Sequence, residues 1–310
     1  MREPVIQYLY LGRVDYAEAL RLQAEMVKLR FEERVGDVLL LLEHPPVLTL
    51  GRNANRANIL ASSQLLAARG VTLHEINRGG DVTYHGPGQL VGYPIFDLRK
   101  TPNPATGARL GPVDFVRLME ESLIRLCAGF GVAAGRICGL TGVWCPPGLD
   151  SLDESCGTRK ASDPPAGERK IGAIGIHVSR GITSHGFAFN VTTDLDYFKL
   201  INPCGITDRP VTSLEKEIAL CGAAAPAGAL ELEPLAHRTA DKFGEVFEQP
   251  VEAVAKLAAL DVSLGEVAQR IEDAHAKDAH ASEAPAVGVP LKLPKEIERL
   301  QRRPEQPVKA

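Results

Sequence analysis

One glycine-rich segment, RGGDVTYHGPGQ at residues 78–89, combines residue types that could bind a substrate. Arg78 offers a planar cation, Gly79 and Gly80 let the backbone turn tightly, and Thr83 to His85 alternate as in a strand. No Gly-Lys-Ser/Thr follows, which excludes a Walker loop, and the glycine spacing does not fit a dinucleotide fingerprint. Taken alone, the pattern is also typical of a hairpin turn with ordinary polar flanks.

Two further residues, Lys170 and Cys204, could supply reactive groups. Lys170 stands at the start of the glycine-rich stretch IGAIGIH, and Cys204 lies in the turn-like context INPCGI. A lysine at the start of a strand is more often a solvated end, and a lone cysteine is more often inert packing. Repeated glycine weakens a strand, so its presence here indicates that something approaches the backbone closely. The residues alone leave both interpretations open.

Together, a thiol and an amine suit acyl transfer between thioesters. A free thiol has a pKa of about 8.5 and needs a cationic or basic partner to ionise at neutral pH. A lysine could stabilise the thiolate and later take the proton of an incoming amine. The oxyanion would need preorganised N–H donors, from the Cys204–Gly205 turn or from the glycine-rich strands.

Composition narrows the class of protein. The chain has 310 residues, 45% hydrophobic and 24% charged, with a net charge of −4. This balance argues against nucleic-acid binding and against a polybasic membrane contact. No signal-peptide pattern and no apolar run of membrane-spanning length occurs. The six cysteines form no C-x-x-C pair, so we expect a soluble, cytoplasmic protein with reduced thiols and without a metal.

The apolar periodicity and the turn residues predict the elements that must position these groups. Helices are predicted over residues 15–34, 62–69, 112–130, 214–220 and 234–248. Strands are predicted over 37–44 and 47–52 as a hairpin, over 71–78 and 139–145, and as a pair within 170–194 that turns at Ser179–Arg180–Gly181. Ser213 is expected to cap the fourth helix. The strands do not alternate with helices as βαβ units would, so the predicted fold is α+β, a mostly antiparallel sheet packed by helices.

The domain organisation is expected to be simple. Residues 1–250 should form one catalytic domain, interrupted by a loop insertion at 146–168 that is rich in Pro, Gly, Ser and charge. Residues 251–310 should form a C-terminal extension, disordered beyond about residue 275 because its composition there is rich in Ala, Pro and charge.

Three blocks of sequence together resemble the lipoyl(octanoyl) transferase family: RGGDVTYHGPGQLVGYPI, KIGAIGIHVSRGITSHGFAFNV and FKLINPCGITDRPVTSL. The resemblance covers about residues 8–245, with the blocks in order. It implies a fold of the biotin/lipoate protein ligase type. It also implies transfer of an octanoyl group from octanoyl-acyl carrier protein to the lipoyl-accepting lysine of lipoate-dependent proteins, with no cofactor.

The same resemblance implies roles for individual residues. Cys204 would be the nucleophile that carries the thioester, and Lys170 would activate it. The implied substrate-binding residues are Arg78, Gly79, Gly80, Asp81, Val82, Thr83, Tyr84, His85, Ala173, Ile174, Gly175, Gly186, Phe187 and Ala188. The implied acceptors are the lipoyl domains of 2-oxoacid dehydrogenases and the glycine cleavage H protein.

Other functions were weighed against this one. An ATP-dependent lipoate or biotin ligase would share the fold, but an adenylating enzyme needs no cysteine nucleophile. A non-catalytic acyl- or carrier-binding protein of the same fold would not need Cys204 or Lys170. A papain-like hydrolase is disfavoured because no signature surrounds the cysteine and no Cys–His–Asn order is visible.

Overall fold

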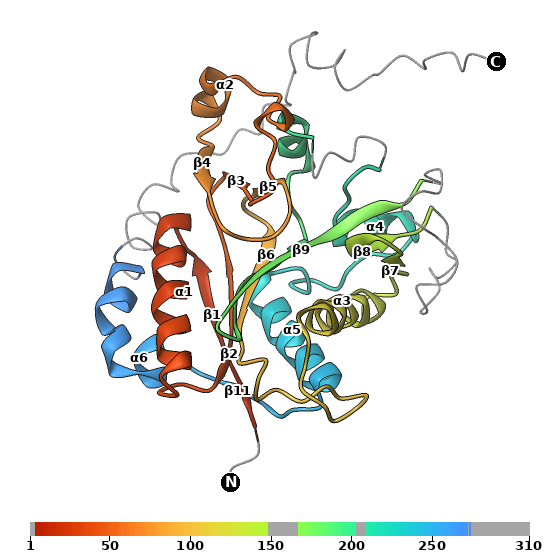
Figure 1. Cartoon of the computed structure of the whole chain (residues 1–310). Helices are drawn as coiled ribbons and strands as arrows, with labels where there is room; N and C mark the ends of the chain where they lie inside the picture. Colours follow the sequence, from red (N-terminus) through yellow and green to blue (C-terminus); the bar gives the residue numbers. More distant parts are fainter. Residues whose placement is uncertain (1–3, 148–166, 203–208, 272, 274–310) are drawn as a thin grey trace, which may run out of the picture.

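In the computed structural model, an eight-stranded sheet runs through the middle of the molecule with helices on both faces (Figure 1). The structure describes residues 4–147, 167–202, 209–271 and 273. The strand order is β11-β1-β2-β6-β10-β9-β8-β7. Only the β1–β2 and β1–β11 pairs of this sheet are parallel, and the other pairs are antiparallel. The predicted α+β class with a mostly antiparallel sheet is therefore confirmed.

The strands of the large sheet are β1 (Ile6–Arg13), β2 (Asp37–Glu43), β6 (Gln89–Ile95), β7 (Gly135–Ile137), β8 (Leu140–Cys145), β9 (Arg169–Ser179), β10 (Ile182–Asn190) and β11 (Val251–Ala253). The central strands β2 and β6 are apolar and buried on both faces, as expected for a sheet covered by helices on each side. The β9–β10 hairpin follows the prediction, with its turn at Arg180–Gly181, where both residues have positive φ.

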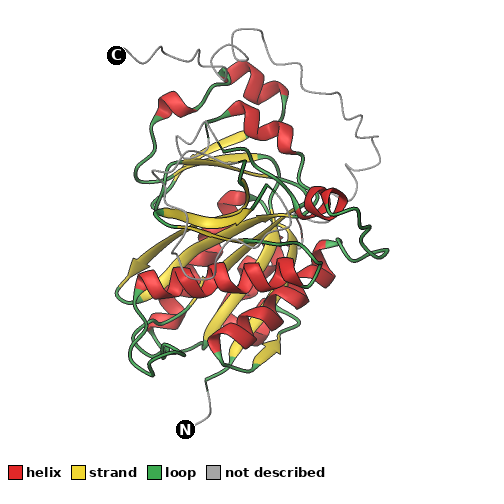
Figure 2. Ribbon diagram, turned by 90° about the vertical axis from the view of Figure 1, so that its right-hand side faces the viewer, coloured by secondary structure: helices red, strands yellow, loops and turns green. Residues whose placement is uncertain are grey.

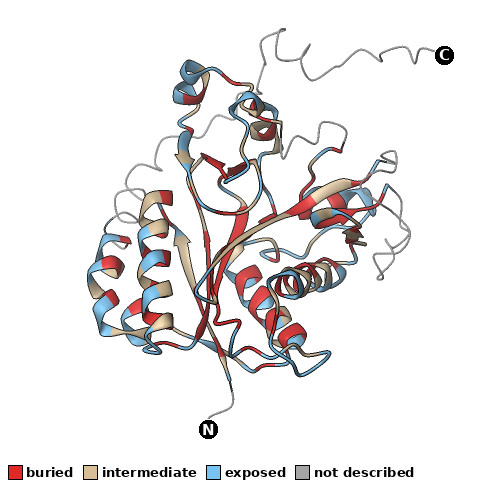
Figure 3. Ribbon diagram, in the orientation of Figure 1, coloured by how far each residue is buried: buried red, intermediate tan, exposed pale blue. Residues whose placement is uncertain are grey.

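Each face of the sheet has its own apolar core. Helix α1 (Tyr16–Phe31) covers one face together with α6 (Leu257–Leu260), and the core there contains Leu22 and Met26. Helices α3 (Pro112–Ala128) and α5 (Leu232–Phe247) cover the other face, around Phe115 and Phe243. Figure 3 shows the buried residues on the strands and on the sides of these helices that face the sheet.

The helices begin where the sequence provides capping residues. The Asp15 carboxylate accepts hydrogen bonds from the N–H groups of Ala17 and Glu18 at the start of α1. Ser62 caps α2 (Ser63–Ala68), and Ser213 caps α4 (Leu214–Leu220) as predicted. All five predicted helices are present, with ends that differ from the prediction by a few residues.

A second, three-stranded sheet lies beside the first and has the order β4-β3-β5 (Figure 2). Its strands are β3 (Val47–Leu50), β4 (Thr72–Glu75) and β5 (Val82–His85). The 3-10 helix η2 (Leu195–Leu200) contributes to its apolar core, and η1 (Arg56–Asn58) is linked to it by a hydrogen bond from Asn58 to Asp81, just before β5. The predicted hairpin of residues 37–44 and 47–52 is wrong. Strands β2 and β3 belong to different sheets, because the Pro45–Pro46 step leads the chain out of the large sheet.

The segment after residue 250 continues the fold. Strand β11 pairs in parallel with β1 at the edge of the large sheet, and Leu264 in η4 (Val262–Leu264) is fully buried in the α1 core. The large sheet therefore includes residues that the sequence assigned to a C-terminal extension. Of the predicted insertion at 146–168, residues 148–166 lie outside the described residues, and so does the predicted tail beyond 275.

Candidate active site

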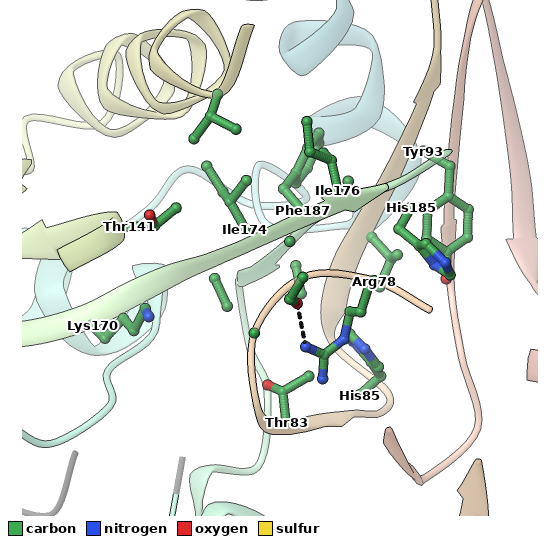
Figure 4. Close-up of a pocket in the computed structure, with 18 of the residues that line it drawn as sticks. Arg78, Thr83, His85, Tyr93, Thr141, Lys170, Ile174, Ile176, His185 and Phe187 are labelled. Atoms are coloured by element: carbon green, nitrogen blue, oxygen red, sulfur yellow. Dashed lines mark hydrogen bonds between the residues drawn. The ribbon is translucent and has the colours of Figure 1, made fainter. Parts of the chain in front are cut away.

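A cavity of about 450 Å³ lies between the loop at residues 78–80 and the glycine-rich strands β9 and β10 (Figure 4). Twelve of the residues proposed from the sequence line it: Arg78, Gly79, Gly80, Thr83, His85, Lys170, Ala173, Ile174, Gly175, Gly186, Phe187 and Ala188. The fold therefore brings together two of the three sequence blocks. The other residues that line it are Tyr16, Val91, Tyr93, Val116, Gly139, Leu140, Thr141, Ile176 and His185.

Three residues proposed as substrate-binding do not line the cavity: Asp81, Val82 and Tyr84. The reason is the period-two alternation of β5, which directs Thr83 and His85 to one face and Val82 and Tyr84 to the other. Val82 and Tyr84 are buried in the core of the small sheet, where the ring of Tyr84 stacks on that of Tyr197. The Asp81 carboxylate instead accepts hydrogen bonds from Asn55 N and from the Asn58 side chain.

Cys204 lies outside the described residues, so its position relative to the cavity stays a prediction. The chain is described up to Asn202 and again from Arg209. Asn202 N donates to Asn58 O at 2.7 Å, and Pro210 O accepts a hydrogen bond from Lys170 N at 2.8 Å. Pro210, six residues after Cys204 in the sequence, is thus hydrogen-bonded to the strand that carries Lys170.

The glycines of β9 and β10 allow close backbone packing around the cavity. A Cβ on Gly175 would lie 2.8 Å from Gly79 O, and a Cβ on Gly186 would lie 2.1 Å from Gly92 O. Gly79 N also donates to Ile176 O at 3.0 Å, which holds the 78–80 loop against β9. The inference that something approaches these glycines closely is therefore confirmed, and what approaches is the protein's own backbone.

A buried hydrogen-bond network fixes the Arg78 end of the cavity. Arg78 donates from Nη2 to Thr49 O and Oγ1 at 2.9 Å, and from Nη1 to Gly79 O. Gln89 Nε2 donates to Asn190 Oδ1, so Gln89 Oε1 is left to accept from His85 Nδ1 at 2.8 Å. This arrangement leaves His85 Nε2 as an acceptor, 3.5 Å from the Thr49 hydroxyl.

Histidines and tyrosines from distant parts of the chain complete this end. His44 donates from Nδ1 to Val14 O and accepts at Nε2 from the Tyr93 hydroxyl, both at 2.7 Å. The rings of Tyr16 and His85 stack with centroids 6.0 Å apart. Sequence reasoning missed Tyr16, His44 and Tyr93, because nothing local marks a residue whose partners come from other elements.

Burial keeps the histidines at this end neutral. It lowers the pKa of His44 to about 4 and that of His185 to about 4, and it lowers the pKa of His85 well below its usual value. The Arg78 guanidinium acts in the same direction on His85 and His185. His185 also has φ +56 within β10, a left-handed conformation that is rare for a non-glycine residue and clusters at functional sites.

Lys170 lies at the opposite end of the cavity, beside Thr141 (Figure 4). Its Nζ is 5.0 Å from the centroid of the Trp144 ring, within the range of a cation–π interaction. The candidate amine and the Arg78 guanidinium lie apart in Figure 4, and Ile174, Ile176 and Phe187 add an apolar surface to the same cavity.

Neither a metal centre nor a membrane span emerges from the part of the chain that is described. Its His, Cys, Asp and Glu side chains form no group of three that could hold a metal ion. None of its helices is both long and apolar enough to cross a bilayer.

Comparison with known proteins assigns the chain to a family. Residues 15–225 match the family model of the lipoyl protein ligase A/B catalytic domain. The octanoyltransferase of Acidobacterium capsulatum is 53% identical over 266 residues, which span 84% of this chain and 100% of that protein. The chain belongs to the octanoyltransferase family. The octanoyltransferase of Koribacter versatilis is also 50% identical over 247 residues, 80% of this chain and 86% of that protein. The chain is therefore an enzyme, an octanoyltransferase.

Solved structures agree on the fold. A lipoate-protein ligase A bound with ATP is 16% identical, with a TM-score of 0.58 over 88% of this chain and 95% of that one. Protein Ta0514 of T. acidophilum, a putative lipoate protein ligase with bound lipoic acid, is 17% identical, with a TM-score of 0.57 over the same shares. This chain thus has the same fold as these two proteins, of the lipoate ligase type that the sequence predicted.

Proposed function

We propose that this octanoyltransferase takes an octanoyl group from octanoyl-acyl carrier protein onto Cys204 and delivers it to the lipoyl-accepting lysine of another protein. The acceptors are the lipoyl domains of 2-oxoacid dehydrogenases and the glycine cleavage H protein. The observation that carries the proposal is a largely apolar cavity, in a chain of the octanoyltransferase family, with the Lys170 amine at one end.

The size and lining of the cavity suit an unbranched acyl chain. Its volume of about 450 Å³ lies within the range of small-molecule sites. The backbones of Gly175 and Gly186 pack too closely against Gly79 and Gly92 to admit side chains there. Ile174, Ile176 and Phe187 supply the apolar surface that would remove methylene groups from water.

The reaction needs two acyl transfers and no ATP. The Cys204 thiolate attacks the thioester carbonyl, a new C–S bond forms, and the carrier thiol leaves with the proton that Cys204 gave up. The acceptor lysine amine then attacks the acyl-enzyme, the C–N bond forms as the C–S bond breaks, and the amine proton returns to the Cys204 sulfur. Lys170 is the group proposed to hold and move that proton.

The histidines of the cavity are the competing bases for this role. His85 and His185 are neutral at pH 7 because burial lowers their pKa values, but both lie at the Arg78 end (Figure 4). His85 Nδ1 already donates to Gln89, and His185 Nε2 lies 2.7 Å from Asn77 Oδ1. These contacts suit histidines that shape the cavity wall, and they favour Lys170 for the proton transfer.

The deciding experiment is intact mass after incubation with octanoyl-acyl carrier protein without ATP, followed by peptide mapping. We expect one octanoyl group on Cys204, which is lost when an apo-lipoyl domain is added and appears on the domain's lysine. A Cys204→Ser variant is the matched control and should form no thioester. Acyl transfer that requires ATP, or an acyl group only on another cysteine, would contradict the proposal.

A further inference from the structure

The Lys170 side chain packs against strand β8, beside Trp144 and Gly142 of that strand. Lys170 and Trp144 are direct partners in the antiparallel β8–β9 pair, so their side chains share one face of the sheet. Lys170 Nζ lies 5.0 Å from the centroid of the Trp144 ring. Two residues earlier on the same face, a Cβ on Gly142 would lie 2.7 Å from Lys170 Cε and 3.3 Å from its Nζ.

Glycine at position 142 is required by the backbone as well as by the lysine. Its φ is +126°, a conformation that residues with a side chain rarely adopt. A Cβ there would also lie 2.5 Å from Gly172 O, a backbone atom that cannot move aside cheaply. The register of the β8–β9 pair shifts next to this point, between Val143 and Trp144. Because Gly142 has no side chain, the end of the Lys170 side chain can lie against its backbone.

A buried carboxylate fixes the backbone at Gly142. Glu120 on α3 is fully buried, and its Oε1 accepts a hydrogen bond from Gly142 N at 2.9 Å. Its Oε2 accepts from Arg117 Nη1 at 2.6 Å and from Arg136 Nε at 3.2 Å. A buried charge is tolerated when it is paired in this way. Glu120, with Arg117 and Arg136, therefore fixes the position of β8 relative to α3.

The Trp144 indole contributes its ring face rather than its N–H. Trp144 is 1% exposed, yet its Nε1 has no hydrogen-bond partner among the described residues. A buried indole N–H usually finds a partner. Apolar packing alone could be provided by another aromatic residue. The specific feature of this position is the Lys170 amine, which lies over the ring.

We propose that Trp144 and Gly142 are positioning residues for the Lys170 amine. The ring attracts the ammonium, and the glycine leaves room for the last carbons of the side chain, so the amine is held at its end of the cavity. Glu120 acts on the same amine through the backbone of Gly142. The proposal rests on the proposed function, because positioning the Lys170 amine matters for catalysis only if that amine serves Cys204.

The test is a double-mutant cycle that compares Trp144→Leu in the wild-type and Lys170→Ala backgrounds. The first readout is the rate at which iodoacetamide alkylates Cys204 at pH 7, measured by peptide mass. It remains measurable when turnover is slow. The second is kcat and KM for octanoyl-acyl carrier protein. We expect Trp144→Leu to slow alkylation and kcat by about 3- to 30-fold, the range of a desolvated cation–π contact, and to leave KM unchanged because Trp144 does not line the cavity.

In the Lys170→Ala background, the same Trp144→Leu change should have no further effect on alkylation. Trp144→Phe keeps a ring face and should retain the wild-type rates within about threefold. Gly142→Ala should slow alkylation at least as much as Trp144→Leu. Its matched control is Gly181→Ala in the β9–β10 turn, where φ is also positive and the atoms nearest to a Cβ belong to the flexible Arg99 side chain, at 2.7 Å.

Equal losses from Trp144→Leu in both backgrounds would show a merely structural role and overturn the inference, as would wild-type rates in Trp144→Leu. Failure of the proposed function looks different. In that case the wild-type protein carries no octanoyl group on Cys204, or Lys170→Ala alkylates as fast as wild type. Thermal unfolding checks that Gly142→Ala folds. If this variant does not fold, the double-mutant cycle on Trp144 alone decides the inference.

Discussion

The two ends of the cavity hold their cations in different ways. At one end, Arg78 donates to Thr49 and to Gly79, inside a network that continues through His85 and Gln89. At the other, the Lys170 ammonium rests on an aromatic face beside a glycine. A guanidinium held by several directed hydrogen bonds is fixed in place and always charged, whereas an amine on a ring can still gain and lose a proton. The difference is consistent with the proposal that the Arg78 end binds substrate and the Lys170 end carries the reactive amine.

The largest expected effect comes from removing the amine. Lys170→Ala should lower kcat by about 10²- to 10⁴-fold, the usual range for losing a general acid–base group, while the fold survives. Lys170→Arg should also be poor, because arginine stays charged and cannot pass a proton. Octanoyl transfer to a lipoyl domain, followed by mass, measures both variants. Near wild-type turnover in Lys170→Arg would reduce the lysine to an electrostatic partner. An active Lys170→Ala together with an inactive alanine variant at His85, His177 or His185 would make a histidine the base.

At the other end, Arg78→Ala should act mainly on binding. It removes the donors to Thr49 O and Gly79 O, so the 78–80 loop loses its side-chain bonds to the small sheet and keeps only backbone bonds such as Arg52 N to Arg78 O. Hydrogen bonds from a charged group are each worth about 1.5–3 kcal/mol, so KM for octanoyl-acyl carrier protein should rise about 10-fold or more, and kcat should change less. Arg56→Ala, in η1 beside the same small sheet, is the matched control. Its exposed ion pair with Glu75 contributes little. A loss confined to kcat would contradict the division between the two ends.

The sequence predicted only part of each end of the cavity, and the physical reason is locality. The β9–β10 hairpin, with the glycine-rich strands that line the cavity, follows from neighbours in the chain. The stacking of Tyr16 on His85 depends on contacts between α1 and the small sheet, which leave no trace in any window of sequence. The 37–52 hairpin failed for the same reason, since pairing with β6 rather than β3 decides where β2 lies. Within block 78–89, strand alternation separated lining residues from core residues such as Tyr84.

The neutral histidines of the Arg78 end predict a dependence of stability on pH. Burial lowers the pKa of His44 to about 4, whereas an unfolded histidine titrates near 6.5. Between these values the unfolded state binds more protons, so this contribution to stability is present above pH 6.5 and is lost as the pH falls toward 4. Between pH 6.5 and 5 the loss is on the order of 2 kcal/mol for such a histidine.

Urea unfolding at pH 7 and pH 5 measures this loss, and His44→Gln isolates the share of His44. Glutamine can donate to Val14 O and accept from the Tyr93 hydroxyl without titrating. We expect the variant to lose less stability than wild type between the two pH values. His237→Gln, at an exposed histidine that contacts Tyr8, should follow the wild-type curve. Identical pH dependence in His44→Gln and wild type would mean that His44 is not held neutral.

The smallest effect is expected from deleting residues 148–166, which come between β8 and β9 in the sequence. The residues on either side of the deletion are already close together. Cys145 and Arg169 are partners in the β8–β9 pair, Arg169 Nη2 donates to Pro146 O at 2.8 Å, and a Cβ on Gly167 would lie 3.2 Å from Pro147 Cβ. A short glycine-serine turn can therefore join Pro147 to Gly167 without moving either strand.

Loop-closure entropy changes slowly with length, so the free energy of unfolding should change by no more than about 1–2 kcal/mol, and octanoyl transfer should stay within about threefold of wild type. A folded variant with normal KM and kcat lowered as far as in Lys170→Ala would show that the deleted segment, and not the β8–β9 pair alone, positions the amine. Loss of folding would mean that residues 148–166 pack against the domain and are not a dispensable insertion.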